Sequence, residues 1–330
     1  MSLTPMKQIL DEARKKGYGV GAYNVNNMEQ IQAIMAAAQK TKSPVIIQAS
    51  RGALKYSNFT YLKHLMIAAA EENPNIPLAM HLDHGNSLET VKKAIDLGFT
   101  SVMIDGSLME DGKTASDYDY NARVTRSVVE YSHKYGVTVE GEIGRLGGIE
   151  DGVGSGSIHL TDPDQAKKFV DETGLDALAI AIGTSHGAYK FKGAANLAID
   201  VLKKVRALVD IPIVLHGASS VPIELIDKVN KYGGALPGAT GVPMASLQEA
   251  IKLGVTKINV DTDGRLAVTA AIREVFATKP EKFDPRDYLG PAREALSEII
   301  AGKMKDFGTA GHSDDYKSMS LEDMKKLYGK

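Results

Sequence analysis

Three histidines lie at or just after three separate apolar runs of the chain. His84 ends the run 77–84, His186 follows the run 176–183, and His216 lies near the end of the run 211–217. Neutral imidazole is a common zinc ligand, and three imidazoles with an open fourth position are typical of a catalytic zinc site. Most single histidines are surface or satisfied core residues, so the prediction of a zinc site depends on the fold bringing all three together.

Carboxylates stand at comparable positions, near the ends of other apolar runs. They are Asp83, Asp105, Glu140 and Glu142. Carboxylates beside a metal can orient the ligating histidines, carry protons or hold a second cation. Asp83 directly precedes His84, and adjacent residues of a strand face opposite sides. Both side chains can therefore reach one site only if the strand ends there, which the following Gly85 favours.

Turns that suit a phosphate group follow the later runs. The segments 183–187 (GTSHG) and 216–220 (HGASS) contain glycine, and the run 256–262 ends in NVDT. Backbone N–H groups of such turns, with a helix N-terminus, bind phosphate without much net positive charge, and Lys190 can add a charge. A tight turn also needs glycine for its own conformation, so each turn alone is a weak indication.

The segment 144–156 is rich in glycine and has few apolar anchors. This composition is typical of a mobile lid over an active site. Glu150, within it, would then be a general acid or base that arrives when the lid closes. The alternative interpretation is an ordinary surface loop that carries acidic residues.

The elements that must position these residues are short apolar runs alternating with amphipathic stretches. The eight predicted strands are 19–25, 44–50, 77–84, 101–106, 138–143, 176–183, 211–217 and 256–262. Helical spacing recurs between them in 28–39, 88–97, 119–135, 164–173, 195–208 and 223–232. Such alternation predicts a parallel α/β sheet, and eight strands without a central break favour a closed (β/α)8 TIM barrel. The turn 25–28 (VNNM) lacks the glycines of an open nucleotide-binding sheet.

Barrel enzymes place their chemistry at the C-terminal ends of the strands, where nearly every run here ends in a polar residue. We expect residues 1–308 to form the barrel and residues 309–330 to form a polar C-terminal extension, with a short helix at 321–327. A Schiff-base aldolase on this fold needs a lysine that projects into the site. Lys257 stands at the start of the eighth run, which is the wrong end. Carbonyl activation would therefore have to come from a metal.

Composition excludes several other classes of protein. The 39 Lys and Arg against 41 Asp and Glu give a net charge of −2, which offers no basic excess to nucleic acid or to an anionic membrane. The absence of cysteine removes disulfides, thiolate nucleophiles and thiolate-ligated zinc. The first residues lack a signal-peptide layout, and no apolar run approaches the ~20 residues that span a bilayer. We therefore expect a cytoplasmic enzyme.

Seven motifs, in this order, resemble those of the class II, metal-dependent fructose-bisphosphate aldolases. They are 21–25 (GAYNV), 48–53 (QASRGA), 81–85 (HLDHG), 101–105 (SVMID), 183–187 (GTSHG), 216–219 (HGAS) and 259–263 (NVDTD). The similarity extends from about Met6 to Gly311. The segment 108–118 is longer than in compact members of the family and resembles a subset with that insertion.

The resemblance implies a role for most of the polar strand ends. A catalytic zinc that acts as a Lewis acid on the ketose would be ligated by His84, His186 and His216. Asp83 would take the proton of the C4 hydroxyl during cleavage, and Glu150 would exchange the proton at C3 of dihydroxyacetone phosphate. Asp105 and Glu142 match a region for a second metal or cation.

The resemblance also implies two phosphate sites and a partner subunit. The phosphate of the dihydroxyacetone half would be held by Gly187, Lys190, Gly217, Ser219, Asp261 and Thr262. Asn259 would contact the enediolate region, and Ser50 and Arg265 match positions that hold the other phosphate. Arg286 resembles an arginine donated by a neighbouring subunit, which implies a homodimer or homotetramer.

The expected function is a zinc-dependent lyase that reversibly cleaves fructose 1,6-bisphosphate to dihydroxyacetone phosphate and glyceraldehyde 3-phosphate, in glycolysis and gluconeogenesis. The C4 epimer, tagatose 1,6-bisphosphate, is the nearest alternative substrate, because small shifts near Asp83 would change the preference. Sedoheptulose bisphosphate is a further alternative substrate. A zinc hydrolase on the same barrel is disfavoured, because the first run ends in 23–26 (YNVN) without a His-x-His pair. A sugar-phosphate-binding scaffold would be expected to lack a ligand or an acid/base residue, and none is missing.

Overall fold

The strands of the protein close into a single barrel. A computed structural model describes residues 3–148, 158–189 and 197–329. Eight parallel strands pair in sequence order, and β1 pairs with β8 to close the ring. They are β1 (Val20–Asn24), β2 (Val45–Ser50), β3 (Leu78–Gly85), β4 (Ser101–Ile104), β5 (Thr138–Ile143), β6 (Ala177–Ile180), β7 (Ile213–Leu215) and β8 (Val255–Val260). The predicted (β/α)8 barrel is confirmed.

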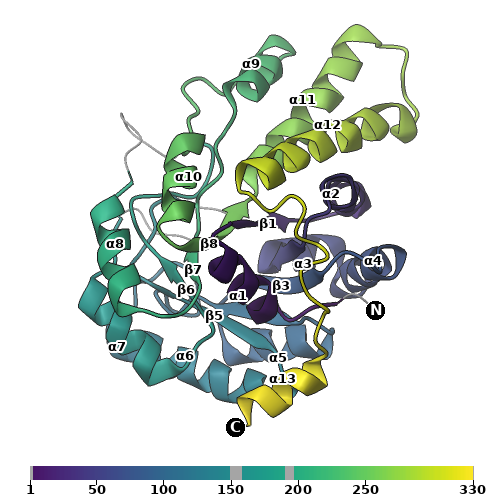
Figure 1. The fold of residues 1–330 in the computed structure, drawn as a ribbon. Helices are drawn as coiled ribbons and strands as arrows, with labels where there is room; N and C mark the ends of the chain where they lie inside the picture. Colours follow the sequence, from purple (N-terminus) through teal and green to yellow (C-terminus); the bar gives the residue numbers. More distant parts are fainter. Residues whose placement is uncertain (1–2, 149–157, 190–196, 330) are drawn as a thin grey trace.

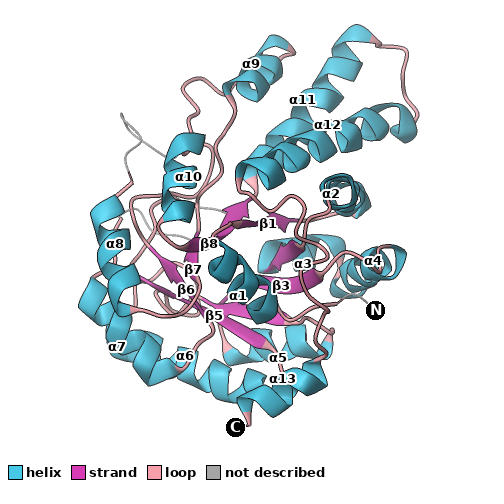
Figure 2. Ribbon diagram, viewed as in Figure 1, coloured by secondary structure: helices cyan, strands magenta, loops and turns pink. Residues whose placement is uncertain are grey.

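Helices surround the strands on the outside of the barrel (Figure 1, Figure 2). They are α1 (Met6–Lys16), α2 (Met28–Thr41), α3 (Arg51–Ser57), α4 (Phe59–Glu72), α5 (Leu88–Asp96), α6 (Tyr118–Ser132), α7 (Pro163–Thr173), α8 (Ile199–Leu208), α9 (Ile223–Lys231), α10 (Met244–Lys252), α11 (Thr262–Thr278), α12 (Pro285–Asp306) and α13 (Leu321–Tyr328). Local chemistry sets their ends: Asp162 accepts a hydrogen bond from Gln165 N and Pro163 opens α7, the arrangement expected at a helix start.

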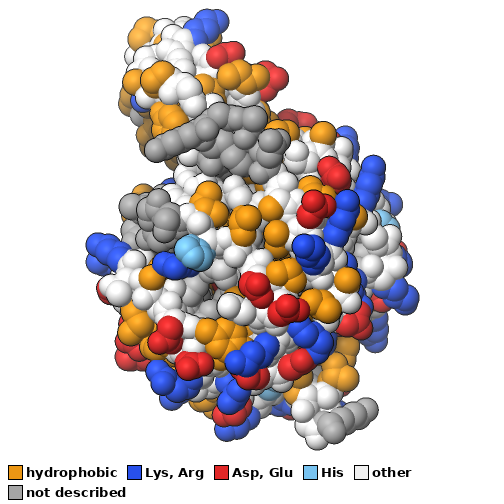
Figure 3. Space-filling view, turned by 90° about the vertical axis from the view of Figure 1, so that its left-hand side faces the viewer, with side chains coloured by type: hydrophobic (Ala, Val, Ile, Leu, Met, Phe, Trp, Pro, Cys, Tyr) orange, Lys and Arg blue, Asp and Glu red, His pale blue; other side chains and the backbone are white. Residues whose placement is uncertain are grey.

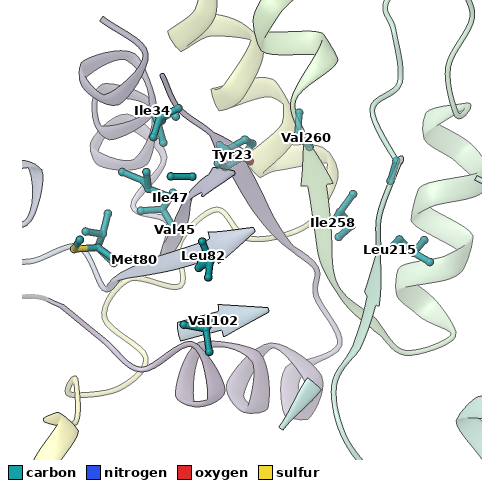
Figure 4. Packing of buried hydrophobic residues seen from close by; sticks show 14 of the residues in the cluster. Tyr23, Ile34, Val45, Ile47, Met80, Leu82, Val102, Leu215, Ile258 and Val260 are labelled. Carbon is teal, nitrogen blue, oxygen red and sulfur yellow. The ribbon is translucent and has the colours of Figure 1, made fainter. Parts of the chain in front are cut away.

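Alternation along the strands separates two apolar layers. Outward-facing residues pack under the helices, as Val45 and Ile47 of β2 do with Ile34 of α2 (Figure 4). Inward-facing residues at the N-terminal end of the barrel are apolar, mostly Ala and Val, and α1 covers them with Met6 and the buried residues that follow it. α1 therefore plugs the bottom of the barrel, and the upper interior is left to polar side chains.

α11 and α12 pack along each other and project from one side of the barrel (Figure 1). Neither helix is among those predicted from the helical spacing in the sequence. Phe283, in the turn between them, is 90% exposed, and Arg286 stands in the first turn of α12. The pair therefore presents exposed apolar and basic side chains away from the barrel axis.

The segment after Thr309 lies against the chain's first helix. Gln8 Nε2 donates to Lys317 O at 2.9 Å, and Met319 N donates to Gln8 Oε1 at 2.8 Å. The hydroxyls of Thr4 and Ser318 are 2.7 Å apart. The segment therefore closes over the N-terminal end of the barrel.

The predicted short helix at 321–327 is present as α13, and it is anchored at its end by Tyr328. The Tyr328 ring stacks on His133 with centroids 3.6 Å apart. Its hydroxyl donates to Asp176 Oδ2 at 2.9 Å, and the same carboxylate contacts His133 Nε2 and accepts from Val139 N. The helix is thus tied to the start of β5 and to the turn before β6.

Charged side chains are mixed on the surface. On the face seen in Figure 3, acidic and basic side chains of the described residues lie interspersed with apolar ones. Among the helices that the structure describes, none has the length and apolar content needed to cross a bilayer.

Candidate active site

The three histidines singled out by the sequence converge at the C-terminal mouth of the barrel. His84 comes from the end of β3, His186 from the loop after β6, and His216 follows β7. The His84 ring is nearly perpendicular to the other two, with centroids 5.0 Å from His186 and 4.8 Å from His216. One nitrogen of each lies within 4.8 Å of the others. This is the spacing of imidazoles that share one ion.

A bulge in β3 lets consecutive residues face the same site. The strand does not end at His84, as the sequence analysis required, but runs on to Gly85. Its register against β4 shifts between Leu82 and Gly85, and His84 adopts a φ of 49°. An extra residue in one strand re-aims the side chains that follow it. A Cβ at Gly85 would lie 2.5 Å from Met103 O, so this turn of the backbone requires glycine.

The orientation of His216 is fixed by two buried carboxylates. Its Nε2 lies 2.7 Å from Glu140 Oε1, and its Nδ1 lies 3.3 Å from Glu142 Oε2. Burial lowers the pKa of His216, but the hydrogen bonds to Glu140 and Glu142 outweigh burial and raise the pKa to about 10. Because Glu140 engages Nε2, the other ring nitrogen is the one presented at the mouth of the barrel.

Lys257 lies inside the barrel, and the expectation that it stands at the wrong end is corrected. The residue is fully buried, and its Nζ is 2.9 Å from Glu140 Oε2 and 2.8 Å from Asn259 Oδ1. Its side chain extends up the barrel axis from the middle of β8. The period of two in a strand supplied a signal that was overlooked, because Lys257, Asn259 and Asp261 fall on one face.

Asp83 is held as an anion by three amide groups. Its Oδ2 accepts from Asn24 Nδ2 at 2.8 Å and from Gln48 Nε2 at 3.3 Å, and its Oδ1 accepts from Asn259 Nδ2 at 3.2 Å. Burial raises the pKa of Asp83, but His84, His216 and Lys257 outweigh burial and lower the pKa to about 2. Asp83 is therefore a fixed, charged acceptor beside the histidines.

A second group of potential ligands shares His84. Oxygens of Asp105 and Glu142 and a nitrogen of His84 lie within 4.8 Å of one another. Asp105 Oδ1 accepts from Ser107 N at 3.1 Å and from Ser107 Oγ at 2.6 Å. Burial and the neighbouring Asp105 raise the pKa of Glu142 above its usual value. Two close, buried carboxylates of this kind suit a cation between them.

The loops expected to bind phosphate lie together. Asp261 N donates to Ser219 Oγ at 3.2 Å, and Thr262 Oγ1 donates to Gly187 O at 3.4 Å. Gly217 has a φ of 58°, and a Cβ there would lie 2.6 Å from Ser185 O. The loops after β6 and β7 therefore approach one another at the N-terminus of α11, which is a favourable place for an anion.

A buried ion pair that was not predicted from the sequence supports these loops. Asp263 Oδ1 accepts from Val221 N at 2.7 Å, and its Oδ2 lies 2.8 Å from Lys303 Nζ of α12. Val221 has a φ of 48°, a conformation that costs energy for a β-branched residue. The only available signal was the second aspartate of the NVDTD motif.

The remaining predicted residues are spread more widely. Arg265 pairs with Asp261, with its Nη2 2.6 Å from Oδ2. Ser50 caps α3, and its Oγ accepts from Ala53 N at 3.1 Å. The Arg286 side chain is 90% exposed and pairs with Asp284 of its own chain, so the structure does not bring it to the histidines. Glu150 and Lys190 lie outside the described residues.

The motifs, fold and histidine cluster match a known family of enzymes. Residues 4–312 match the family model described as fructose-bisphosphate aldolase class-II. The chain is 58% identical to a fructose-bisphosphate aldolase of Giardia intestinalis, over 99% of this chain and 100% of that protein. It is 51% identical to a fructose-bisphosphate aldolase of Pseudomonas aeruginosa, over 100% of this chain and 98% of that protein. The chain therefore belongs to the class-II fructose-bisphosphate aldolases, which are lyases.

Solved structures agree with this assignment. The crystal structure of the YdjI aldolase from Escherichia coli K12 superposes with a TM-score of 0.76 at 31% identity, covering 94% of this chain and 100% of that chain. A putative fructose-1,6-biphosphate aldolase from Coccidioides immitis gives a TM-score of 0.73 at 27% identity, covering 94% and 98% of the two chains. The barrel is thus shared with aldolases of low sequence identity.

Proposed function

We propose that this lyase is a zinc-dependent aldolase that reversibly cleaves fructose 1,6-bisphosphate to dihydroxyacetone phosphate and glyceraldehyde 3-phosphate. The observation that carries the proposal is the cluster of three histidine nitrogens beside the anionic Asp83. The names of the relatives, which are fructose-bisphosphate aldolases, support the choice of substrate. We propose that the reaction serves glycolysis and gluconeogenesis in the cytoplasm.

The residues at the mouth of the barrel fit a zinc ion. Three imidazoles from three strands are a donor set that zinc prefers. Glu140 engages the far nitrogen of His216, which is how a carboxylate usually orients a zinc-bound histidine. We assign His84, His186 and His216 as zinc ligands and Asp105 with Glu142 as the site of a second cation. Zinc, when bound, supplies Lewis-acid polarisation of the ketose carbonyl.

Asp83 acts on the C4 hydroxyl. When the C3–C4 bond breaks, the C4 oxygen becomes the aldehyde oxygen and must lose its proton. Asp83 is the buried anion beside the histidines, and its amide partners hold it in one orientation. It takes this proton during cleavage and returns it during condensation, so its depressed pKa keeps it ready as a base.

The other assignments come from the resemblance. Glu150 would exchange the proton at C3 of dihydroxyacetone phosphate. One phosphate would be bound by Gly187, Lys190, Gly217, Ser219, Asp261 and Thr262, and the other by Ser50 and Arg265, with Asn259 near the reacting carbons. Arg286 would reach the active site of a partner subunit, in a homodimer or homotetramer. Its exposure and its position on the projecting α11–α12 pair support that role. We propose residues 1–308 as the aldolase barrel and 309–330 as a C-terminal extension.

The test compares cleavage of fructose 1,6-bisphosphate with cleavage of tagatose 1,6-bisphosphate. Each is measured before and after chelation, and again after zinc is restored. We expect activity that the chelator abolishes and zinc restores, with the fructose sugar preferred. A preference for the tagatose sugar would reassign the substrate, and chelator-insensitive cleavage would refute the zinc site. Inactivity on both sugars would favour a hydrolase or a binding scaffold.

A further inference from the structure

We propose that Lys257 is a positioning residue that orients two groups at once, the metal ligand His216 and the carboxylate of Asp83. The ammonium group lies below the histidines, inside the barrel, and the side chain is fully buried. It touches neither group directly and acts through one neighbour on each side. The inference rests on the proposed function, because it concerns residues assigned there to zinc and to proton transfer.

The first connection runs through Glu140. Lys257 Nζ lies 2.9 Å from Glu140 Oε2 and 3.3 Å from Oε1, and Oε1 lies 2.7 Å from His216 Nε2. Both side chains are fully buried, so the carboxylate must find its partners inside the protein. By bonding both carboxylate oxygens, Lys257 holds Glu140 in the orientation that points Oε1 at His216, which fixes the imidazole ring.

The second connection runs through the side-chain amide of Asn259. An amide can rotate by 180° and exchange its oxygen and nitrogen. Lys257 Nζ donates to Asn259 Oδ1 at 2.8 Å, and this contact requires the oxygen on that side. The amide nitrogen must then face Asp83, and Nδ2 does donate to Asp83 Oδ1 at 3.2 Å. The cation thus selects the amide orientation that donates to Asp83.

Both connections need a cation with several donors. An ammonium group offers three N–H donors and accepts none, so it can bond both Glu140 and Asn259 without competing for their partners. His81 lies close by, with its Nε2 3.6 Å from Glu140 Oε2. Burial and the neighbouring Lys257 lower the pKa of His81 to about 3, so beside the lysine His81 is neutral and Lys257 carries the positive charge.

The experiment removes the lysine cation together with the negative charge of its buried partner Glu140. Lys257→Met alone leaves the buried Glu140 Oε2 without its lysine partner, so we pair it with Glu140→Gln, whose amide oxygen can still accept from His216. Glu140→Gln alone is the reference variant, which shows what loss of the carboxylate does by itself. Lys257→Gln with Glu140→Gln is a second, more polar pair in case the first does not fold. The control is Lys40→Met with Glu298→Gln, which neutralises an exposed lysine–carboxylate pair between α2 and α12. For each variant we measure thermal unfolding, zinc affinity by competition with a chelator, and kcat and KM for fructose 1,6-bisphosphate.

We expect the Lys257 pair to fold and to bind zinc about 10- to 100-fold more weakly than the wild type. With zinc saturating, kcat should fall by about 10-fold or more while KM changes little, because the phosphate loops are untouched. The Lys40 pair should keep wild-type zinc affinity, and Glu140→Gln alone should lose less zinc affinity and less kcat than the Lys257 pair. Wild-type zinc affinity and kcat in a folded Lys257 pair would overturn the proposal, as would failure of both Lys257 pairs to fold. A wild-type protein that binds no zinc would instead refute the proposed function.

Discussion

Oδ1 of Asp83 lies 3.9 Å from Nε2 of His84, the residue that follows it in the chain. Neighbours in a regular strand point to opposite faces, so this proximity depends on the register shift and the positive φ at His84. The bulge places the proposed proton acceptor Asp83 and the proposed metal ligand His84 side by side on one strand. The two roles can therefore be separated by single substitutions.

Substitution of His84 and of Asp83 should give different losses. His84→Ala removes one of three zinc ligands, so we expect loss of both bound metal and activity. Asp83→Asn keeps the shape of the side chain but cannot take a proton, so zinc should stay bound while kcat falls by about 10²–10⁴-fold. Metal content by elemental analysis and cleavage rates distinguish the two. An active, zinc-free His84→Ala protein would refute the site.

A methyl group at Gly217 should disturb the phosphate loops. The positive φ and the clash with Ser185 O predict that Gly217→Ala lowers the free energy of unfolding by about 1–3 kcal/mol. It should also raise KM for the bisphosphate. Gly302→Ala is the control, because it lies inside α12 with no atom within 4 Å of an added Cβ. It should be neutral or stabilising by about 0.5–1 kcal/mol. Equal effects of both substitutions in chemical denaturation would contradict the role of Gly217.

Zinc affinity should depend steeply on pH. The pKa of His216 is raised to about 10 in the metal-free protein, so its ring carries a proton at neutral pH that zinc must displace. The apparent association constant should therefore rise by at least about tenfold per pH unit between pH 6 and 8, and acid should release the metal. Titration with zinc against a competing chelator measures this slope. Glu140→Gln removes the carboxylate that raises the pKa and should flatten the slope, whereas a flat wild-type profile would contradict the prediction.

The C-terminal helix should contribute to stability but not to catalysis. Tyr328→Phe keeps the ring on His133 and removes the hydrogen bond to Asp176. We expect a loss of about 1 kcal/mol of unfolding free energy with unchanged kcat, because the contact lies at the opposite end of the barrel from the histidines. Tyr61→Phe, at a mostly exposed tyrosine, should change neither quantity. A fall in kcat for Tyr328→Phe would show that the helix communicates with the site.

The sequence predicted the strands and the gathering of the histidines because both depend on local patterns. Short apolar runs bounded by glycine or proline are visible without the fold, and a closed barrel brings every strand end to one rim. The bulge at His84 was not predictable, since it arises from a shift in the register between β3 and β4. Lys257 was misplaced for a related reason: counting along the run located its backbone, whereas its long side chain carries the ammonium further up the axis. The packing of the last segment on α1 depends on contacts between distant residues, which no local pattern encodes.

The docking of the last segment also bears on how the molecule is made. Gln8 precedes its hydrogen-bond partners Lys317 and Met319 by 309 and 311 residues. The apolar side of α1 covers strands from β1 to β7, so it has its full set of partners only after β7 has been made. The hydrogen bonds of Gln8 can form only after translation has passed Met319, so a chain that stops earlier would lack the segment that lies over α1.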